Sequence, residues 1–168
     1  MAPLFSDRLF IVDLDDTLAN TTRDMRGSWE NLPQLTLAPG AHQFVRRYGE
    51  RTVLLTAGNE EVQLRKIAHL GLKGILRLEI VVPEPELKQA ALESLLASCA
   101  LPPSRFVIIG DRLDKEIAAG NRLGFVTVRM RLPHGRWGAY EPASEEERPH
   151  ATIETFDELE GALLSLPY

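Results

Sequence analysis

The stretch Phe10-Ile11-Val12-Asp13-Leu14-Asp15-Asp16-Thr17-Leu18 decides the fold, because an apolar run of strand length, Leu9 to Leu14, delivers three carboxylates at its end. Side chains alternate along a strand with a period of two, so Asp13 and Asp15 are predicted to point to the same side. Two such carboxylates can share a divalent cation or divide nucleophile and acid/base roles. The alternative is that Asp15 or Asp16 only caps a following helix.

Further strand-sized apolar runs follow, and stretches of helical period lie between them. The runs are Thr52 to Thr56, Ile80 to Val82, Phe106 to Ile109 and Phe125 to Val128, and we expect a closing strand at Ala151 to Ile153. The helical stripes are Ala41, Phe44, Val45 and Tyr48; Leu64, Ile67 and Ala68; Leu87, Ala90, Ala91 and Leu95; Ile117, Ala118 and Leu123; and Phe156, Leu159, Leu163 and Leu164. This alternation predicts an α/β fold, a three-layer Rossmann-like parallel sheet flanked by helices.

Two segments, 19–39 and 131–150, show no regular pattern. Each follows the carboxyl end of a predicted strand, which is where ligands bind in open α/β sheets. Side chains predicted to line an entrance there are Arg23, Arg26, Trp29, His134, Arg136, Trp137 and Tyr140.

The composition indicates a globular protein, which we expect to form a single domain over residues 1–168. The formal net charge of −5 gives no general attraction for phosphate backbones and argues against a nucleic-acid partner. Cys99 is the one cysteine, so the chain can form neither an internal disulfide nor a cysteine zinc site. With no signal-peptide pattern in Met1 to Arg8 and no apolar run near ~20 residues, we expect a cytoplasmic protein without a membrane partner.

The second run leads into a turn that suits an anion. It ends at Thr56 and is followed by Ala57-Gly58-Asn59, which combines a hydroxyl with backbone N–H groups at a strand-to-helix turn. Alternatively, Thr56 is an ordinary strand residue and Asn59 is the N-cap of a helix.

Later residues supply a cation and more carboxylates. Lys88 begins a helical stripe, where its ammonium could neutralise phosphate or hold a carboxylate, although most such lysines are solvated. The fourth run continues into Gly110-Asp111, with Asp114 and Glu116 beyond it. Carboxylates at strand ends are typical of oxygen-ligand Mg²⁺ sites.

The ordered set Asp13-x-Asp15-x-Thr17, Thr56, Lys88 and Gly110-Asp111 resembles the haloacid dehalogenase (HAD) superfamily, in its phosphatase branch. The resemblance covers most of the chain, since the closing strand and the Phe156 to Leu166 helix also match the family's usual ending.

The resemblance implies a Mg²⁺-dependent phosphomonoester hydrolase. Asp13 would attack phosphorus and form an aspartyl-phosphate, and Asp15 would protonate the leaving oxygen and then activate water. The implied metal site comprises Asp13, the main-chain carbonyl of Asp15, Asp111 and Glu116; the implied phosphate site comprises Thr56, Ala57 and Lys88. Asp15 must then keep a proton near neutrality, which ionised Asp13 favours and the metal opposes.

Some assignments stay open in the sequence. Gln89 follows Lys88 where many relatives have proline, so Lys73 is a rival lysine, and Asp114 is a rival to Glu116. Arg112 stands where smaller residues are common, so it could crowd the site or contact the substrate.

The lengths of the segments between the motifs indicate how open the site is and so which substrates it can accept. The gaps between Asp13, Thr56 and Lys88 leave no room for a large cap domain, so the site should be open. We expect a small phosphorylated substrate, enclosed by a loop or by a second subunit of a homo-oligomer. The alternatives are a polynucleotide or protein phosphatase and a non-hydrolytic, phosphate-sensing regulatory domain.

Overall fold

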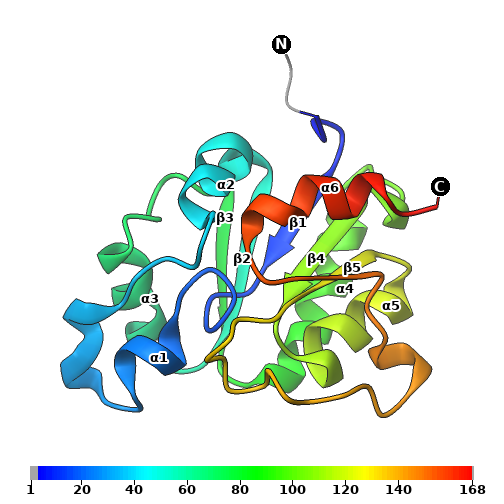
Figure 1. Ribbon diagram of the computed structural model, residues 1–168. Helices are drawn as coiled ribbons and strands as arrows, with labels where there is room; N and C mark the ends of the chain where they lie inside the picture. Colours follow the sequence, from blue (N-terminus) through cyan, green and yellow to red (C-terminus); the bar gives the residue numbers. More distant parts are fainter. Residues whose placement is uncertain (1–3, 168) are drawn as a thin grey trace.

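The computed structural model describes residues 4–167, and its centre is a parallel sheet in the order β3-β2-β1-β4-β5-β6 (Figure 1). The strands are β1 (Leu9–Val12), β2 (Thr52–Ala57), β3 (Leu78–Val82), β4 (Phe106–Gly110), β5 (Val126–Met130) and β6 (Ala151–Ile153). Every neighbouring pair is parallel. All six strands overlap the predicted runs, which confirms the α/β fold class.

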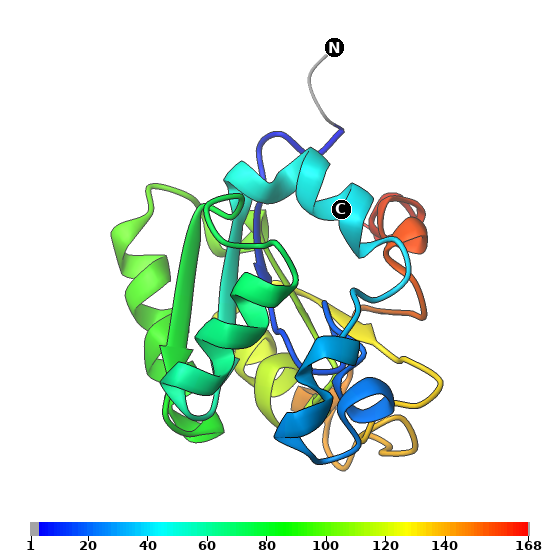
Figure 2. The ribbon, with the colours of Figure 1, turned by 90° about the vertical axis from the view of Figure 1, so that its left-hand side faces the viewer.

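Helices cover both faces of the sheet. They are α1 (Thr21–Met25), α2 (Ala41–Tyr48), α3 (Glu60–His69), α4 (Lys88–Ser98), α5 (Ala118–Leu123) and α6 (Leu159–Leu164). Phe10 and Val12 of β1 pack in one apolar core with α2, α3 and α6, whereas Leu9 and Ile11 pack in the other with α4 and α5. Figure 2 looks onto edge strand β3, with α4 on one side and α3 on the other. Within the described residues, no helix has the length and apolar character needed to cross a bilayer.

The central strands align their carboxyl ends. Val12 pairs in register with Leu54 of β2 and with Ile109 of β4, so the residues after β1 and β4 leave the sheet side by side. Strand β1 ends two residues earlier than predicted. The chain turns there, and Asp16 adopts a left-handed backbone conformation with φ of 54°.

The segment 19–39 is more regular than predicted. It contains α1 and a 3₁₀ helix over Trp29–Gln34, and Ala19 pairs antiparallel with Leu37. A five-residue helix is too short to show a helical period, and Pro33 lies inside the 3₁₀ helix, so the sequence carried no clear signal. In the segment 131–150, the regular element is a 3₁₀ turn at Glu145–Glu147.

Candidate active site

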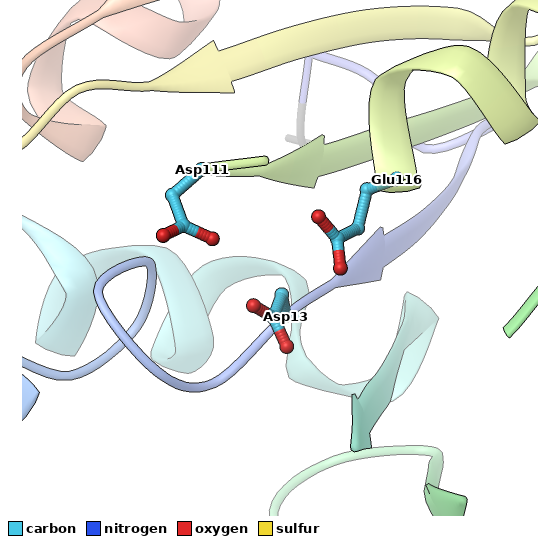
Figure 3. A group of neighbouring side chains, drawn as sticks. All are labelled: Asp13, Asp111 and Glu116. Carbon is cyan, nitrogen blue, oxygen red and sulfur yellow. The ribbon is translucent and has the colours of Figure 1, made fainter. Parts of the chain in front are cut away.

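Three buried carboxylates meet at the carboxyl edge of the sheet. Asp13 follows β1, Asp111 follows β4, and Glu116 lies on a π-helical turn over Leu113–Ile117 (Figure 3). One oxygen from each lies within 4.8 Å of the others, and the three residues are at most 8% exposed. π-helical turns occur frequently at functional sites, and this one turns Glu116 inward.

Lys88 is the cation of this cluster. Its Nζ lies 2.9 Å from Oδ1 of Asp13 and also contacts Oε1 of Glu116, and the residue is 4% exposed. Burial acts to lower the pKa of Lys88, but Asp13 and Glu116 raise it above its usual value, so the ammonium stays charged. The rival Lys73 is exposed, away from the carboxylates.

One ammonium does not balance three carboxylates. Burial raises the pKa of Asp13 to about 7, with Glu116 and Asp15 acting in the same direction and Lys88 opposing them. Burial also raises the pKa of Asp111 well above its ordinary value, helped by Asp13 and Glu116. The cluster therefore favours a further positive charge.

A divalent cation fits this site. Oε2 of Glu116 is buried and has no hydrogen-bond partner among the described residues, and a buried oxygen without a partner is costly. Carboxylate oxygens are the ligands that Mg²⁺ prefers. The rival Asp114 instead forms two hydrogen bonds with Arg112, at 3.0 and 2.7 Å, so Asp13, Asp111 and Glu116 are the residues that could hold the ion.

Asp15 is held away from the carboxylate cluster by polar groups. Its Oδ1 accepts hydrogen bonds from Lys66 Nζ at 2.8 Å and from Thr21 Oγ1 at 2.7 Å, and its Oδ2 accepts one from Gln63 Nε2 at 2.9 Å. Burial acts to raise the pKa of Asp15, but Lys66 and these hydrogen bonds outweigh it and lower the pKa below the usual range. In this conformation Asp15 is an ionised carboxylate.

Gln63 also organises the turn after β2. Its Nε2 lies 2.6 Å from Oγ1 of the buried Thr56, which accepts the hydrogen bond and keeps its own proton for another acceptor. Ala57 lines the cavity above the carboxylates, whereas the Gly58 N–H donates to the carbonyl of Val82. Asn59 accepts a hydrogen bond from Val62 N and caps α3, as the alternative interpretation of Asn59 expected.

Sequence reasoning missed Lys66 and Gln63. The stripe of Leu64, Ile67 and Ala68 was expected to be the buried face of α3, but Leu64 is 44% exposed and Gln63, Lys66 and Ile67 face inward. Residues three apart on a helix lie on the same face. The spacing of Gln63 and Lys66, next to the apolar Ile67, was therefore a signal in the sequence that both side chains face inward.

Asp16 joins the two loop segments. Its Oδ1 accepts a hydrogen bond from Thr22 N at 2.8 Å, and its Oδ2 accepts bonds from Thr22 Oγ1 at 2.6 Å and Arg136 N at 2.9 Å. Asp16 thus binds an N–H group in the first turn of α1, although Asn20 occupies the N-cap position, and it also fixes the second loop 120 positions away.

Some of the side chains predicted at the entrance line one of two adjoining cavities, and the others lie elsewhere. A cavity of about 290 Å³ contains the carboxylates, and Arg112, Arg136 and Trp137 line it. An adjoining cavity of about 430 Å³ has Arg26, Trp29 and Arg136 in its lining. The remaining predicted side chains lie elsewhere: Arg23 pairs with Asp24, His134 lines a separate hollow, and Tyr140 contacts Glu147.

The Arg112 guanidinium lies 4.3 Å from the centre of the Trp137 ring while it pairs with Asp114. It lines the cavity that contains the carboxylates.

Comparisons with known proteins agree with this fold. The family model of haloacid dehalogenase-like hydrolases matches residues 32–124, more than half of the chain. A glyceraldehyde 3-phosphate phosphatase of Methanopyrus kandleri is 31% identical over 123 residues, 68% of this chain and 50% of that protein. This chain thus spans about half the length of the curated relative it matches.

Solved structures share the architecture at low identity. The HAD-hydrolase YfnB of Bacillus subtilis has a TM-score of 0.70 and 15% identity, covering 95% of this chain and 99% of that one. A predicted phosphoglycolate phosphatase of Haemophilus somnus has a TM-score of 0.72 and 14% identity, covering 93% and 97%. With the family match, the parallel sheet and the carboxylates at its edge, this chain belongs to the haloacid dehalogenase-like hydrolases.

Proposed function

We propose that this chain is a Mg²⁺-dependent phosphomonoester hydrolase acting through an aspartyl-phosphate on Asp13. The observation that carries the proposal is the convergence of Asp13, Asp111 and Glu116 around Lys88, with Oε2 of Glu116 unpartnered. The single continuous sheet supports one hydrolase domain as the unit that performs this reaction. The phosphatase relative supports the reaction class.

The site would bind the phosphoryl group between its cations and its hydrogen-bond donors. Lys88 would neutralise phosphoryl charge, and Thr56 would donate its free hydroxyl proton, with Ala57 beside it. Asp13, Asp111, Glu116 and the main-chain carbonyl of Asp15 would hold Mg²⁺. When bound, the ion would neutralise charge on Asp13 and on the phosphoryl oxygens.

In the first step an oxygen of Asp13 attacks phosphorus, and the bond between phosphorus and the substrate oxygen breaks. Asp15 gives a proton to that oxygen, so the products are an alcohol and the aspartyl-phosphate. In the second step water attacks phosphorus and gives a proton to Asp15. The bond to Asp13 breaks, inorganic phosphate leaves, and both side chains return to their starting protonation states.

Asp15 must change partner to act in this way. In the structure it is ionised and bound to Lys66, yet a third of its side chain is exposed, at the cavity wall. We infer that Asp15 takes up a proton and turns from Lys66 toward the leaving oxygen when substrate enters. Thr21 and Gln63 hold it in the resting position.

The test is phosphate release from p-nitrophenyl phosphate and from small phosphate esters, phosphopeptides and 3′-phosphorylated oligonucleotides, with Mg²⁺ or with EDTA. We expect many turnovers with Mg²⁺ on the small esters, and at least about a thousandfold loss in Asp13→Asn with the fold retained by circular dichroism. Undiminished turnover in that variant would exclude Asp13 as the nucleophile. An aspartyl-phosphate that persists for minutes after one turnover would favour the phosphate-sensing alternative.

A further inference from the structure

We propose that the cavity beside the carboxylates is a leaving-group site for a second anionic group, so that the substrates are small phosphomonoesters bearing a carboxylate or a second phosphate. This inference rests on the proposed phosphatase function and specifies its substrate class.

The cavity adjoins the catalytic one and shares part of its wall. It has a volume of about 430 Å³, and Thr21, Thr22, Lys66 and Arg136 line both spaces. Thr21, in the shared wall, donates a hydrogen bond to Asp15, the residue of the catalytic cavity proposed to protonate the leaving oxygen. A substrate with its phosphoryl group at Asp13 would therefore extend its leaving group into this cavity.

The two cavities differ in their charged residues. The catalytic cavity is lined by five carboxylate residues and four cationic residues, namely Asp13, Asp15, Asp16, Asp111 and Glu116, and Lys66, Lys88, Arg112 and Arg136. The adjoining cavity is lined by Arg26, Lys66 and Arg136 and by no acidic residue. In a chain with a formal net charge of −5, this is a local positive site that favours an anion.

Two of its cations lack a carboxylate partner. Lys66 is paired with Asp15, but within residues 4–167 neither Arg26 nor Arg136 forms an ion pair. The Arg136 guanidinium lies 5.4 Å from the centre of the Trp137 ring, while its backbone N–H is fixed by Asp16. An arginine with a fixed backbone and an unpaired guanidinium suits bidentate binding of a carboxylate or phosphate.

The backbone at Arg26 supports a role for its side chain. Arg26 ends α1 with φ of 51°, a left-handed position that normally favours glycine, and Gly27 follows with φ of 74°. Non-glycine residues held in sparsely populated backbone conformations cluster at functional sites. Met25, Trp29 and Val62 supply apolar surface that can contact the carbon skeleton of the leaving group.

The experiment compares matched substrates that differ in one terminal group. The first pair is 3-phosphoglycerate and glycerol 3-phosphate, and the second is 1,3-propanediol bisphosphate and its monophosphate. We expect kcat/KM to favour the doubly anionic member of at least one pair by about tenfold or more. Comparing the two pairs shows whether a carboxylate or a phosphate is the preferred second anion. A preference below twofold in both pairs would overturn the inference while leaving the phosphatase function intact.

The roles of Arg26 and Arg136 are tested by the same comparison, the ratio of kcat/KM values within each substrate pair. Arg26→Gly removes the guanidinium and suits the left-handed backbone, so the fold should persist; Arg136→Ala removes the second one. Each single variant should lower the kcat/KM preference for the doubly anionic substrate severalfold, and the double variant should bring the ratio near unity. Arg46 is exposed on α2 and lies outside both cavities. Arg46→Ala removes the same charge as the arginine variants and should leave the kcat/KM preference unchanged. A preference that survives in the double variant would refute the assignment.

Binding measured without turnover separates the two proposals. Calorimetric titration of 3-phosphoglycerate and glycerol 3-phosphate into Asp13→Asn with Mg²⁺ should show tighter binding of the former. Arg26→Gly in that background should reduce the difference in affinity, and Arg26→Gly together with Arg136→Ala should remove it. Equal affinities would overturn the leaving-group site. A difference without turnover by the unmodified chain would support this site and contradict the proposed hydrolysis.

Discussion

Nζ of Lys66 lies 2.8 Å from Oδ1 of Asp15, which joins α3 to the turn after β1 across 51 positions of the chain. The Lys66 side chain is buried and that of Asp15 is one-third exposed, so solvent screens the pair only in part. It keeps the pKa of Asp15 low and holds its carboxylate in the resting position. Lys66 is therefore a positioning residue for the proposed acid/base group.

Lys66→Met should slow hydrolysis of alkyl phosphates most. Without Lys66, Asp15 loses the resting position from which it turns toward the leaving oxygen, and an alkoxide leaving group depends on a well-placed acid. We expect kcat/KM for glycerol 3-phosphate to fall by about 10- to 100-fold and that for p-nitrophenyl phosphate by less, because p-nitrophenolate leaves without a proton. The neighbouring Arg65→Met, on the exposed side of α3, is the matched control. An equal loss for both substrates would contradict the positioning role.

Lys88→Met should destabilise the metal-free protein by about 3 kcal/mol, since removing one partner of a buried ion pair leaves unpaired charge. The measurement is denaturant unfolding in EDTA, repeated with Mg²⁺, which should restore part of the loss. Lys73→Met, at an exposed position, should change the free energy of unfolding by about 0.5 kcal/mol or less and leave activity intact. Inactivation by the second substitution would reinstate Lys73 as the phosphate-binding lysine.

Mg²⁺ should raise the melting temperature of the native chain, because an ion that binds only the folded state stabilises it. A hundredfold excess over the dissociation constant corresponds to about 2.7 kcal/mol. Asp111→Asn should abolish most of this shift, and Asp114→Asn, whose native carboxylate pairs with Arg112, should retain it. Differential scanning calorimetry with Mg²⁺ and with EDTA measures the shift in melting temperature of both variants. A shift that is lost in Asp114→Asn and kept in Asp111→Asn would place the ion at Asp114.

Two glycine-to-alanine substitutions should act in opposite directions on stability. A Cβ on Gly120 would lie 2.5 Å from Ile108 Cγ2 and 2.8 Å from Thr127 Cγ2, so Gly120→Ala should cost about 1–3 kcal/mol by forcing α5 from the sheet. Gly161 in α6 has no atom within 4 Å of such a Cβ, and Gly161→Ala should add about 0.5–1 kcal/mol. Chemical denaturation of both variants tests the packing, and a stable Gly120→Ala would show that α5 is looser than described.

The sequence by itself determined the strands, the parallel sheet and the residues that follow β1, β2 and β4. Apolar runs of strand length are local signals, and parallel strands necessarily bring their carboxyl ends to one edge. Asp13, Thr56 and Asp111 were therefore predictable as neighbours. Lys88 was predictable as a candidate through the order of the motifs.

The tertiary structure alone decided which other polar groups reach that edge. Glu116 rather than Asp114 joins the cluster, because the π-helical turn directs the Glu116 side chain inward while Asp114 forms an ion pair with Arg112. Lys66 reaches Asp15, and Asp16 holds the backbone of Arg136, across separations that no local pattern encodes. A buried polar side chain settles where its partner is, and that partner's position depends on how the helices and loops pack around the sheet.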